Sequence, residues 1–257
     1  MKRFLLAAAL VGLGATPAMA EDCFPEVNTE LRQFIVGYGS LMEEASKRRS
    51  SPHSGINHPV KVTGFQRAWN ARGNTFGYST TYLGVEAPLT ADQRRVAGLA
   101  QDPPEMYAAV YEDKDRADIK GTDARETFYC RYPVSPDQID LLDGWAFPED
   151  AQIWIYALKP GHEGQPPTEN WPIVQSYVDI FITGCLDLAD QVIPSLESDL
   201  DFAAQCIETT DGWSESWVND RLYPRRAFIY QPNASTIDKL LMRASKTKPL
   251  FPNIKLE

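Results

Sequence analysis

The stretch FIVGYGSL, residues 34–41, indicates the organisation of this chain more directly than any other. Its first three residues are apolar and include β-branched ones, which predicts a buried strand. The strand ends at two glycines that flank Tyr38, and a polar segment compatible with a helix follows over residues 42–49. Backbone N–H groups at such an end lack partners, and glycine lets a ligand approach them closely. We therefore expect an anion-binding loop here; the alternative is a tight turn that binds nothing.

Three established glycine motifs fail on these residues. The dinucleotide-binding pattern G-x-G-x-x-G fits Gly37 and Gly39 but finds Met42 in place of the third glycine. The nucleophile elbow G-x-S-x-G requires glycine at positions 38 and 42, which hold Tyr38 and Met42. No lysine stands where a P-loop requires one. The stretch therefore matches none of these three sites.

A second informative stretch, residues 123–134, reads DARETFYCRYPV. Together the two stretches resemble the γ-glutamylcyclotransferase family, and the first resembles its glutathione-acting branch, in which Gly-Tyr-Gly-Ser-Leu is typical. The second stretch keeps six positions of the family's downstream motif: Asp123, Arg125, Glu126, Tyr129, Arg131 and Val134. It departs in having Thr122 where leucine is usual. The resemblance covers roughly residues 34–159, is least regular over residues 98–122, and does not extend into the C-terminal third.

The resemblance implies both a fold and a site. The fold is α+β, with a small mixed β-barrel, flanking helices and a helical C-terminal third. The implied catalytic acid/base is Glu126, and the implied substrate-binding residues are Val36, Gly37, Tyr38, Gly39, Ser40 and Leu41. The alternative for Glu126 is an ordinary carboxylate at a helix end, paired with Arg125 or Arg131. Because both motifs of one family occur in order, the catalytic role is favoured.

The implied activity is release of 5-oxoproline from glutathione or a related γ-glutamyl compound, a carbon–nitrogen lyase reaction. The substrate's α-amine attacks its own γ-carbonyl, so the two reactants already share one molecule. No protein nucleophile, metal or other cofactor is required. One carboxylate with a raised pKa can carry the proton to the leaving nitrogen. The loop's N–H groups either stabilise the carbonyl oxygen or hold the α-carboxylate, and Arg67 and Arg72 are further candidate cations.

Two other function classes remain open. A non-catalytic γ-glutamyl or small-molecule binding protein of the same fold would keep the loop without turnover, and export favours it because glutathione is chiefly intracellular. The carboxylate of Glu126 counts against it, since a pure binder has no need of an acid there. The second alternative, a thiol oxidoreductase, is supported only by the number of cysteines. The sequence decides neither the preferred substrate nor the oligomeric state.

Patterns along the rest of the chain predict several strands followed by helices. We expect β-strands at residues 60–69, 79–86, 94–100, 127–135 and 152–159 in addition to the first strand. Residues 103–120 are mixed in pattern and predict short helical turns. Helical apolar spacing occurs at residues 173–190 and 195–209. Strands with few interleaved helices favour an α+β barrel.

Residues 1–20 have the composition of an export signal. Lys2 and Arg3 supply the positive start, residues 4–15 form an apolar run, and Ala18-Met19-Ala20 is a small-x-small cleavage site. The apolar run is too short to span a bilayer. We expect its removal, leaving residues 21–257 as a single γ-glutamylcyclotransferase-like domain with a C-terminal helical extension over about 170–257. The mature chain would lie in a bacterial periplasm or be secreted, without membrane attachment.

The composition of the chain limits the kinds of molecule that it is expected to bind. The formal charge at pH 7 is −10 and no basic run occurs, so nucleic-acid binding is not expected. The chain is 43% hydrophobic, enough to build a core. The expected partner is a small γ-glutamyl molecule.

Four cysteines predict disulfides in an exported protein. Cys185 and Cys206 are closest in sequence and fall in adjacent predicted helices, so we favour that pair, which leaves Cys23 to bond Cys130. Reduced thiols are the alternative. No C-x-x-C spacing supports a zinc or thioredoxin-like site.

Overall fold

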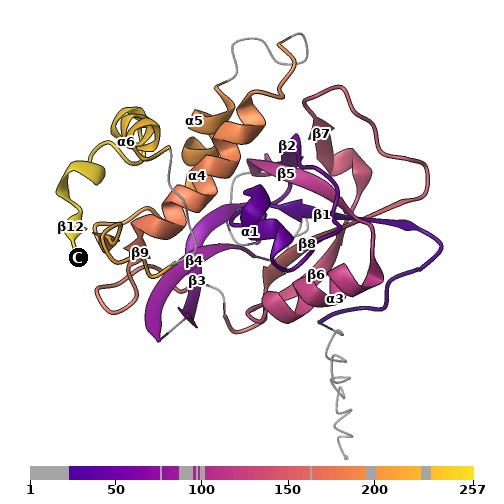
Figure 1. Ribbon diagram of the computed structural model, residues 1–257, viewed down its shortest axis with the longest axis horizontal. Helices are drawn as coiled ribbons and strands as arrows, with labels where there is room; N and C mark the ends of the chain where they lie inside the picture. Colours follow the sequence, from indigo (N-terminus) through magenta and orange to yellow (C-terminus); the bar gives the residue numbers. More distant parts are fainter. Residues whose placement is uncertain are drawn as a thin grey trace, which may run out of the picture.

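Figure 1 shows the chain as a computed structural model. The residues that the structure describes are 23–75, 77–86, 95–96, 98, 102–162, 164–194, 201–226 and 233–257. The predicted signal, residues 1–20, lies outside them, and so does most of the predicted strand at 94–100. None of the helices in the described part combines the length and the apolar character needed to cross a bilayer.

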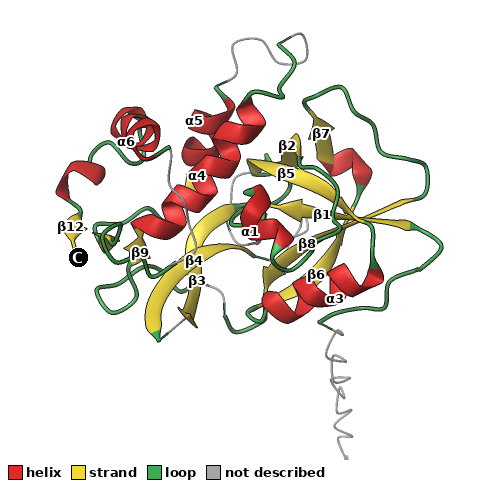
Figure 2. Cartoon of the chain, in the orientation of Figure 1, coloured by secondary structure: helices red, strands yellow, loops and turns green. Residues whose placement is uncertain are grey.

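A six-stranded sheet with the order β6-β8-β1-β5-β2-β7 forms the centre of the fold (Figure 2). Its strands are β1 (Arg32–Gly37), β2 (His58–Thr63), β5 (Glu105–Asp113), β6 (Tyr129–Val134), β7 (Ile139–Leu141) and β8 (Ala151–Leu158). β1 lies antiparallel to β5 and parallel to β8, and its apolar residues 34–36 are at most 1% exposed. Within the described residues the edge strands β6 and β7 do not pair, so the sheet is open. The α+β class is confirmed, but the predicted closed barrel is not.

Two small sheets flank this one. The long hairpin of β3 (Arg67–Thr75) and β4 (Tyr78–Val85) pairs with β10 (Thr210–Asp211). The third sheet joins β9 (Ile173–Val174), β11 (Trp217–Asn219) and β12 (Lys255–Leu256). The predicted strand at 60–69 divides into β2 and β3 because Gly64 adopts a φ of +96°, a left-handed conformation that turns the chain.

Residues predicted to form helical turns contain the strand β5 instead. In its sequence, EMYAAVYED, the six consecutive residues 106–111 are buried, Glu112 is intermediate and Asp113 is buried. A strand that has neighbours on both edges and packed layers on both faces loses the apolar–polar alternation that marks a strand in sequence. The helix α3 (Arg116–Arg125) begins only after β5 ends.

The remaining helices pack around the sheets. They are α1 (Glu44–Arg48), α4 (Gln175–Ala189), α5 (Phe202–Glu208) and α6 (Ala234–Arg243), with short 3₁₀ turns at Pro136–Gln138 and Phe251–Asn253. α4 is buried at eleven of its fifteen positions and runs diagonally across the hairpin of β3 and β4 in Figure 1. A Cβ on Gly184 would lie 2.5 Å from the carbonyl carbon of Met42, so glycine lets α4 lie against the backbone that follows β1. The described residues of the C-terminal third form three helices and four short strands, so this part is not simply helical.

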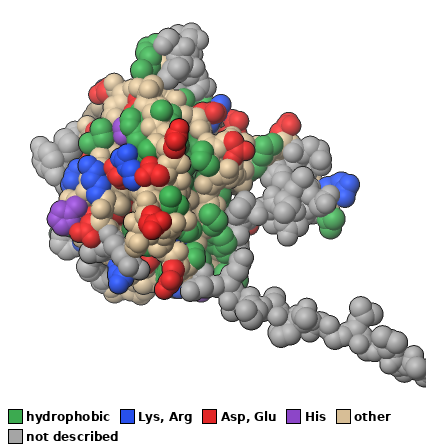
Figure 3. Space-filling view, turned by 90° about the vertical axis from the view of Figure 1, so that its right-hand side faces the viewer, with side chains coloured by type: hydrophobic (Ala, Val, Ile, Leu, Met, Phe, Trp, Pro, Cys, Tyr) green, Lys and Arg blue, Asp and Glu red, His purple; other side chains and the backbone are tan. Residues whose placement is uncertain are grey.

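Charges are interspersed on the surface. On the face shown in Figure 3, acidic side chains lie beside lysine and arginine side chains. Ion pairs in the molecule include Arg32 with Glu112, at 2.8 Å, and Arg48 with Glu44, at 3.2 Å. Exposed pairs of this kind typically contribute about 0–1 kcal/mol each, so they carry little of the stability.

Candidate active site

The loop after β1 is anchored at both of its ends. The hydroxyl of Tyr38 donates to the carbonyl oxygen of Tyr156 at 2.5 Å, and the N–H of Met42 donates to the carbonyl oxygen of Gly39 at 3.0 Å. Among the described residues, the N–H groups of residues 39–41 donate no hydrogen bond. Three consecutive N–H groups without partners are suited to binding an anion or a developing oxyanion.

Arg67 is fully buried and donates a hydrogen bond to the loop after β1. Its guanidinium stacks over the ring of Phe181, 4.6 Å from the centroid. It donates to the carbonyl oxygens of Tyr38 at 3.1 Å, Tyr107 at 2.8 Å and Cys206 at 2.6 Å, and to the hydroxyl of Thr210 at 2.7 Å. These bonds occupy the guanidinium, so Arg67 is a structural cation of the core. Arg72 likewise donates to the carbonyl oxygen of Pro166, at 2.6 Å.

Glu126 follows the last turn of α3. Its N–H donates to the carbonyl oxygen of Thr122 at 2.9 Å, which extends the helical hydrogen bonding by one residue. Asp123 secures this turn, because its carboxylate accepts hydrogen bonds from the Tyr156 hydroxyl at 2.7 Å and from Arg131 at 3.0 Å. The end of α3 is therefore fixed to β6 and β8, and the position of Glu126 is fixed with it.

Arg125 joins the two sequence stretches. Its Nη2 donates to the hydroxyl oxygen of Ser40 at 2.6 Å, and its Nε lies 3.2 Å from Oε1 of Glu126. Its Nη1 donates to the carbonyl oxygen of Ser46 at 2.7 Å and to Ser50 Oγ at 3.2 Å. One side chain thus positions the loop after β1 relative to the carboxylate at the end of α3.

One cavity contains most of the residues that the sequence predicts. It is lined by Val36, Tyr38, Gly39, Ser40, Leu41 and Glu126, together with Leu83, Tyr129, Tyr156 and Tyr177. Gly37 is not in the lining; a Cβ there would lie 2.9 Å from Cβ of Leu41, so this glycine serves the turn. The enclosed space is about 30 Å³, room for one or two water molecules.

Glu126 is the carboxyl group of the cavity lining. Its side chain is 15% exposed. Burial raises the pKa of its carboxyl, and the positive charges of Arg125 and Arg226 act in the opposite direction. Burial also raises the pKa of Tyr38 and Tyr129 well above the usual value, so both phenols stay protonated. A carboxyl with a raised pKa is the property that a general acid/base requires.

Tyr177 is a lining residue that the sequence did not indicate. It comes from the first turn of α4, in the part of the chain without a motif. The hydroxyls of Tyr38, Tyr129 and Tyr156 each donate to a protein oxygen, whereas that of Tyr177 has no hydrogen-bond partner within the described residues. A Cβ on Gly39 would lie 2.8 Å from this hydroxyl. No local pattern marks this position, since only the packing of α4 brings it to the loop.

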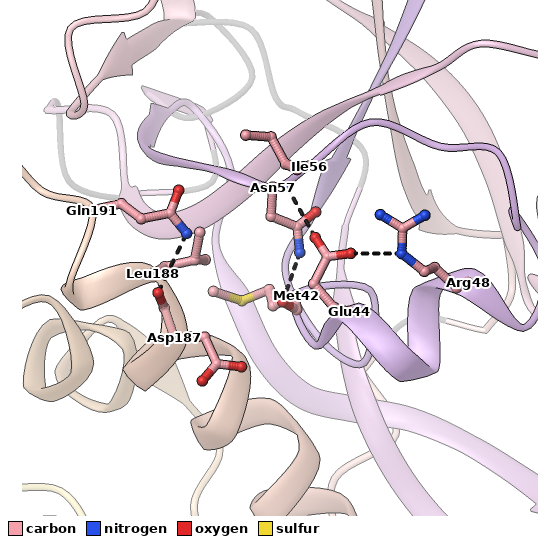
Figure 4. A pocket seen from close by; sticks show the side chains of 8 residues that line it. All are labelled: Met42, Glu44, Arg48, Ile56, Asn57, Asp187, Leu188 and Gln191. Carbon is pink, nitrogen blue, oxygen red and sulfur yellow. Dashed lines mark hydrogen bonds and ion pairs between the residues drawn. The ribbon is translucent and has the colours of Figure 1, made fainter.

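A larger hollow lies beside α1 and the C-terminal end of α4 (Figure 4). Its volume is about 490 Å³, and its lining includes Met42, Asn57 and Asp187. The carboxylate of Glu44 in its wall is already paired with Arg48 and accepts the N–H of Asn57 at 3.1 Å. The hollow has the size of a ligand site, but Glu44, Arg48 and Asn57 in its wall are bonded within the protein, so we place the chemistry at Glu126.

The structure contains one of the two predicted disulfides and lacks the other. Cys23 is bonded to Cys130, whereas Cys185 and Cys206 are free and buried. Burial raises the pKa of the Cys185 thiol well above the usual value, and contact with Cys206 raises it further. The Cys23–Cys130 bond ties the segment before β1 to β6.

Comparison with known proteins gives a likeness of fold. No family model and no curated protein matches the sequence. A solved γ-glutamyl cyclotransferase is 11% identical, with 68% of this chain and 86% of its own covered and a TM-score of 0.44. The chain resembles γ-glutamyl cyclotransferases in fold.

Two further structures show the same likeness. The yeast γ-glutamyl cyclotransferase specific to glutathione is 15% identical over 69% of this chain and 87% of its own, with a TM-score of 0.37. The human protein loc79017 is 12% identical over 68% of this chain and 85% of its own, with a TM-score of 0.41. At such identities the likeness concerns fold alone.

Proposed function

We propose that this chain is an exported γ-glutamylcyclotransferase-like enzyme that converts the γ-glutamyl group of glutathione or a related compound to 5-oxoproline. One observation carries the proposal: Glu126, a half-buried carboxyl with a raised pKa, lines the same cavity as residues 39–41, whose N–H groups have no acceptor among the described residues. The two segments are far apart in sequence, and Arg125 joins them through Ser40.

The reaction needs one proton carrier and one charge stabiliser. The carboxylate of Glu126 takes a proton from the substrate's α-ammonium, and the free amine attacks the γ-carbonyl carbon. A new C–N bond closes the five-membered ring while the original amide C–N bond breaks. Glu126 returns its proton to the leaving nitrogen, so the carboxylate is regenerated. The ring nitrogen releases a second proton as the amide forms, and the departing amine takes up a proton and leaves as an ammonium ion. Positioned proton transfer of this kind is typically worth about 10²–10⁴-fold in rate.

The N–H groups of residues 39–41 stabilise negative charge on the substrate. One such donor aimed at a developing oxyanion contributes on the order of 3 kcal/mol to transition-state stabilisation. A γ-glutamyl group is larger than the cavity of about 30 Å³, so side chains move when it binds. Tyr177 is the expected one, since its hydroxyl is not anchored to a protein oxygen in the described part of the chain.

Export is part of the proposal. The predicted signal at residues 1–20 and the Cys23–Cys130 disulfide both support an oxidising compartment. We propose that the mature chain, residues 21–257, is one γ-glutamylcyclotransferase-like domain whose C-terminal extension packs on the sheets through α4.

A direct assay tests the function. The mature protein, prepared without reductant, is incubated with glutathione and with a set of γ-glutamyl amino acids, and 5-oxoproline is quantified by mass spectrometry. We expect release by the wild type and a loss of about 10²-fold or more in Glu126→Gln. Calorimetric binding without 5-oxoproline would instead establish the non-catalytic binding protein. Neither binding nor release would reject the γ-glutamyl assignment.

A further inference from the structure

Arg226 lies at the edge of the candidate site, on a segment outside the two stretches that predicted it. The carboxylate of Asp220, 1% exposed, accepts hydrogen bonds from Ser176 Oγ at 2.6 Å and from the N–H of Arg225 at 2.8 Å. The N–H of Arg226 donates to Ser176 Oγ at 3.3 Å. These bonds fix the backbone of Arg226 to the first turn of α4, next to Tyr177.

The guanidinium of Arg226 lies near one tyrosine of the cavity, Tyr177, and near the adjacent Tyr82. Its central carbon lies 5.7 Å from the ring centroids of both Tyr82 and Tyr177. These two rings meet edge to face with centroids 5.0 Å apart, and Tyr177 lines the cavity of Glu126. Burial dominates the pKa of Glu126, and the charge of Arg226 opposes it together with that of Arg125. Arg226 is therefore close enough to act on the carboxyl.

The side-chain donors of Arg226 have no acceptor in the part of the chain that the structure describes. Within the described residues its guanidinium makes no hydrogen bond and no salt bridge. The neighbouring Arg225 differs, because it donates to the carbonyl oxygen of Ser79 at 3.0 Å and pairs with Glu257 at 2.5 Å. A guanidinium presents five N–H donors in a planar fork that matches a carboxylate. Arg226 retains this fork for a ligand.

Positive charge gathers around Glu126 in a chain whose formal charge is −10. The pKa of Arg49 is lowered by burial and then by the charges of Arg226 and Arg125, so these three cations share one region. Arg125 pairs with Glu126, whereas the guanidinium of Arg226 has no anionic partner among the described residues. An anionic ligand would give Arg226 such a partner, and Arg226 is half-buried, which strengthens its interaction with an anion.

We propose that Arg226 binds a carboxylate of the substrate, which adds a specificity residue from the C-terminal third to the site. The inference rests on the proposed function for the identity of the ligand as a γ-glutamyl compound. The α-carboxylate of the glutamyl group and a carboxylate on the leaving amine share the same chemistry. Substrates that possess or lack the second carboxylate separate the two sources.

Binding is measured by calorimetry in the Glu126→Gln protein, in which the ligand is not consumed. The two probes are γ-glutamylglycine, which has both carboxylates, and γ-glutamyl methylamide, which has only the α-carboxylate. Adding Arg226→Gln should raise the Kd of γ-glutamylglycine about tenfold or more, the loss expected for a hydrogen bond to a charged group. An equal rise for the methylamide assigns the α-carboxylate, and an unchanged methylamide Kd assigns the leaving-amine carboxylate.

Arg225→Gln is the matched control, because it removes a neighbouring guanidinium whose donors are already paired within the protein. Its Kd values should stay within about twofold of the parent. Three results would each overturn the inference. Arg225→Gln and Arg226→Gln could weaken binding equally, Arg226→Gln could leave binding unchanged, or neither probe could bind to the parent protein. If Arg226→Gln weakens binding but wild-type protein forms no 5-oxoproline, the enzyme proposal fails and the Arg226 assignment stands. If the wild type forms 5-oxoproline and Arg226→Gln has an unchanged KM, the enzyme proposal stands and the Arg226 assignment fails.

Discussion

Arg125 donates a hydrogen bond from Nη2 to the hydroxyl oxygen of Ser40 across 2.6 Å, while its Nε pairs with Glu126. The positive charge lowers the pKa of Glu126 against the larger effect of burial. Arg125 thus has two separable effects, one on the geometry of the loop and one on the protonation of the carboxyl.

Arg125→Gln should move the pH profile of turnover. Without the positive charge the pKa of Glu126 rises further, so the carboxylate that accepts the proton forms only at higher pH. Below that pKa, each unit of increase reduces the ionised fraction about tenfold. The rising limb of kcat against pH should shift to higher pH. Ser40→Ala is the control, because it releases the loop while keeping the ion pair and should leave the limb in place. If the rising limb of kcat against pH is identical in the wild type and Arg125→Gln, Arg125 has no electrostatic effect on Glu126.

Gly39→Val should abolish turnover while the fold survives. The added side chain would meet the Tyr177 hydroxyl, which lies only 2.8 Å from the Cβ position. Gly39 does not adopt a positive φ, so strain in a left-handed turn is not part of the effect. Because the conflict is with one hydroxyl, Gly39→Ala should be partly rescued by Tyr177→Phe. Near-normal 5-oxoproline release by a folded Gly39→Val protein would show that the loop is only a turn.

Asp113 should make stability depend on pH. It is 3% exposed, and neither carboxylate oxygen has a hydrogen-bond partner among the described residues. Burial, with the charge of Asp118, raises its pKa to about 7. The folded state therefore keeps this proton up to about pH 7, whereas the unfolded chain loses it near pH 4. The free energy of unfolding accordingly falls as pH rises between these values.

The substitution Asp113→Asn should remove this pH dependence of the free energy of unfolding. Thermal melting of the variant and the wild type should diverge from pH 4 to pH 7, with the variant more stable at the upper end by on the order of a few kcal/mol. Asp140→Asn, on an aspartate whose side chain is 63% exposed, is the control and should leave the profile unchanged. A constant difference between Asp113→Asn and the wild type across this range would show that the carboxyl is ionised throughout.

The local parts of the site could be predicted from sequence. The strand and glycine loop of residues 34–41 depend on neighbouring residues, and Glu126 stands at a fixed spacing from Tyr129 and Arg131. The role of Arg67 could not be predicted, because its acceptors are carbonyl oxygens from β5, α5 and the loop after β1. A buried arginine and an exposed one look the same in sequence.

The residues that the C-terminal third contributes to the site could not be predicted from sequence for the same reason. Tyr177 and Arg226 reach the site only because α4 packs against the backbone at Met42 through Gly184. The cysteine pairing also depends on distance in space: Cys23 and Cys130 are 107 residues apart yet bonded. The predicted Cys23–Cys130 pair is present, but Cys185 and Cys206, which proximity in sequence also paired, are free, since nothing local distinguishes two helical cysteines that touch from two that are bonded.

Thiol titration should find two free thiols in the unfolded, non-reduced mature protein. Cys185 and Cys206 account for both, and they should be unreactive in the folded protein because both are buried. Prior reduction should raise the count to four and lower the melting temperature, since a disulfide typically contributes about 2–4 kcal/mol. A count of four without reductant would contradict the Cys23–Cys130 bond. A count of zero would show that the second pair is oxidised as well.

Glu126→Gln is the decisive substitution for the site. It keeps the size of the side chain and some of its hydrogen bonding but removes the proton acceptor, so 5-oxoproline release should fall by about 10²-fold or more. The wild-type rate should rise with pH through the raised pKa of Glu126, because the reaction starts from the carboxylate. The variant should lack that limb. Substrate Kd should change little, because the N–H groups of residues 39–41 are untouched.

Stability separates the catalytic role from a structural one. The raised pKa means that the folded state favours the neutral carboxyl, so ionisation of Glu126 costs stability at pH values above the unfolded pKa. Glu126→Gln should therefore melt at the same temperature as the wild type or higher at pH 7, despite losing the ion pair with Arg125. A structural salt bridge predicts the opposite: earlier melting, with normal turnover in the protein that remains folded. Melting and 5-oxoproline release are measured on the same preparations, and an unstable but fully active Glu126→Gln would remove Glu126 from the mechanism.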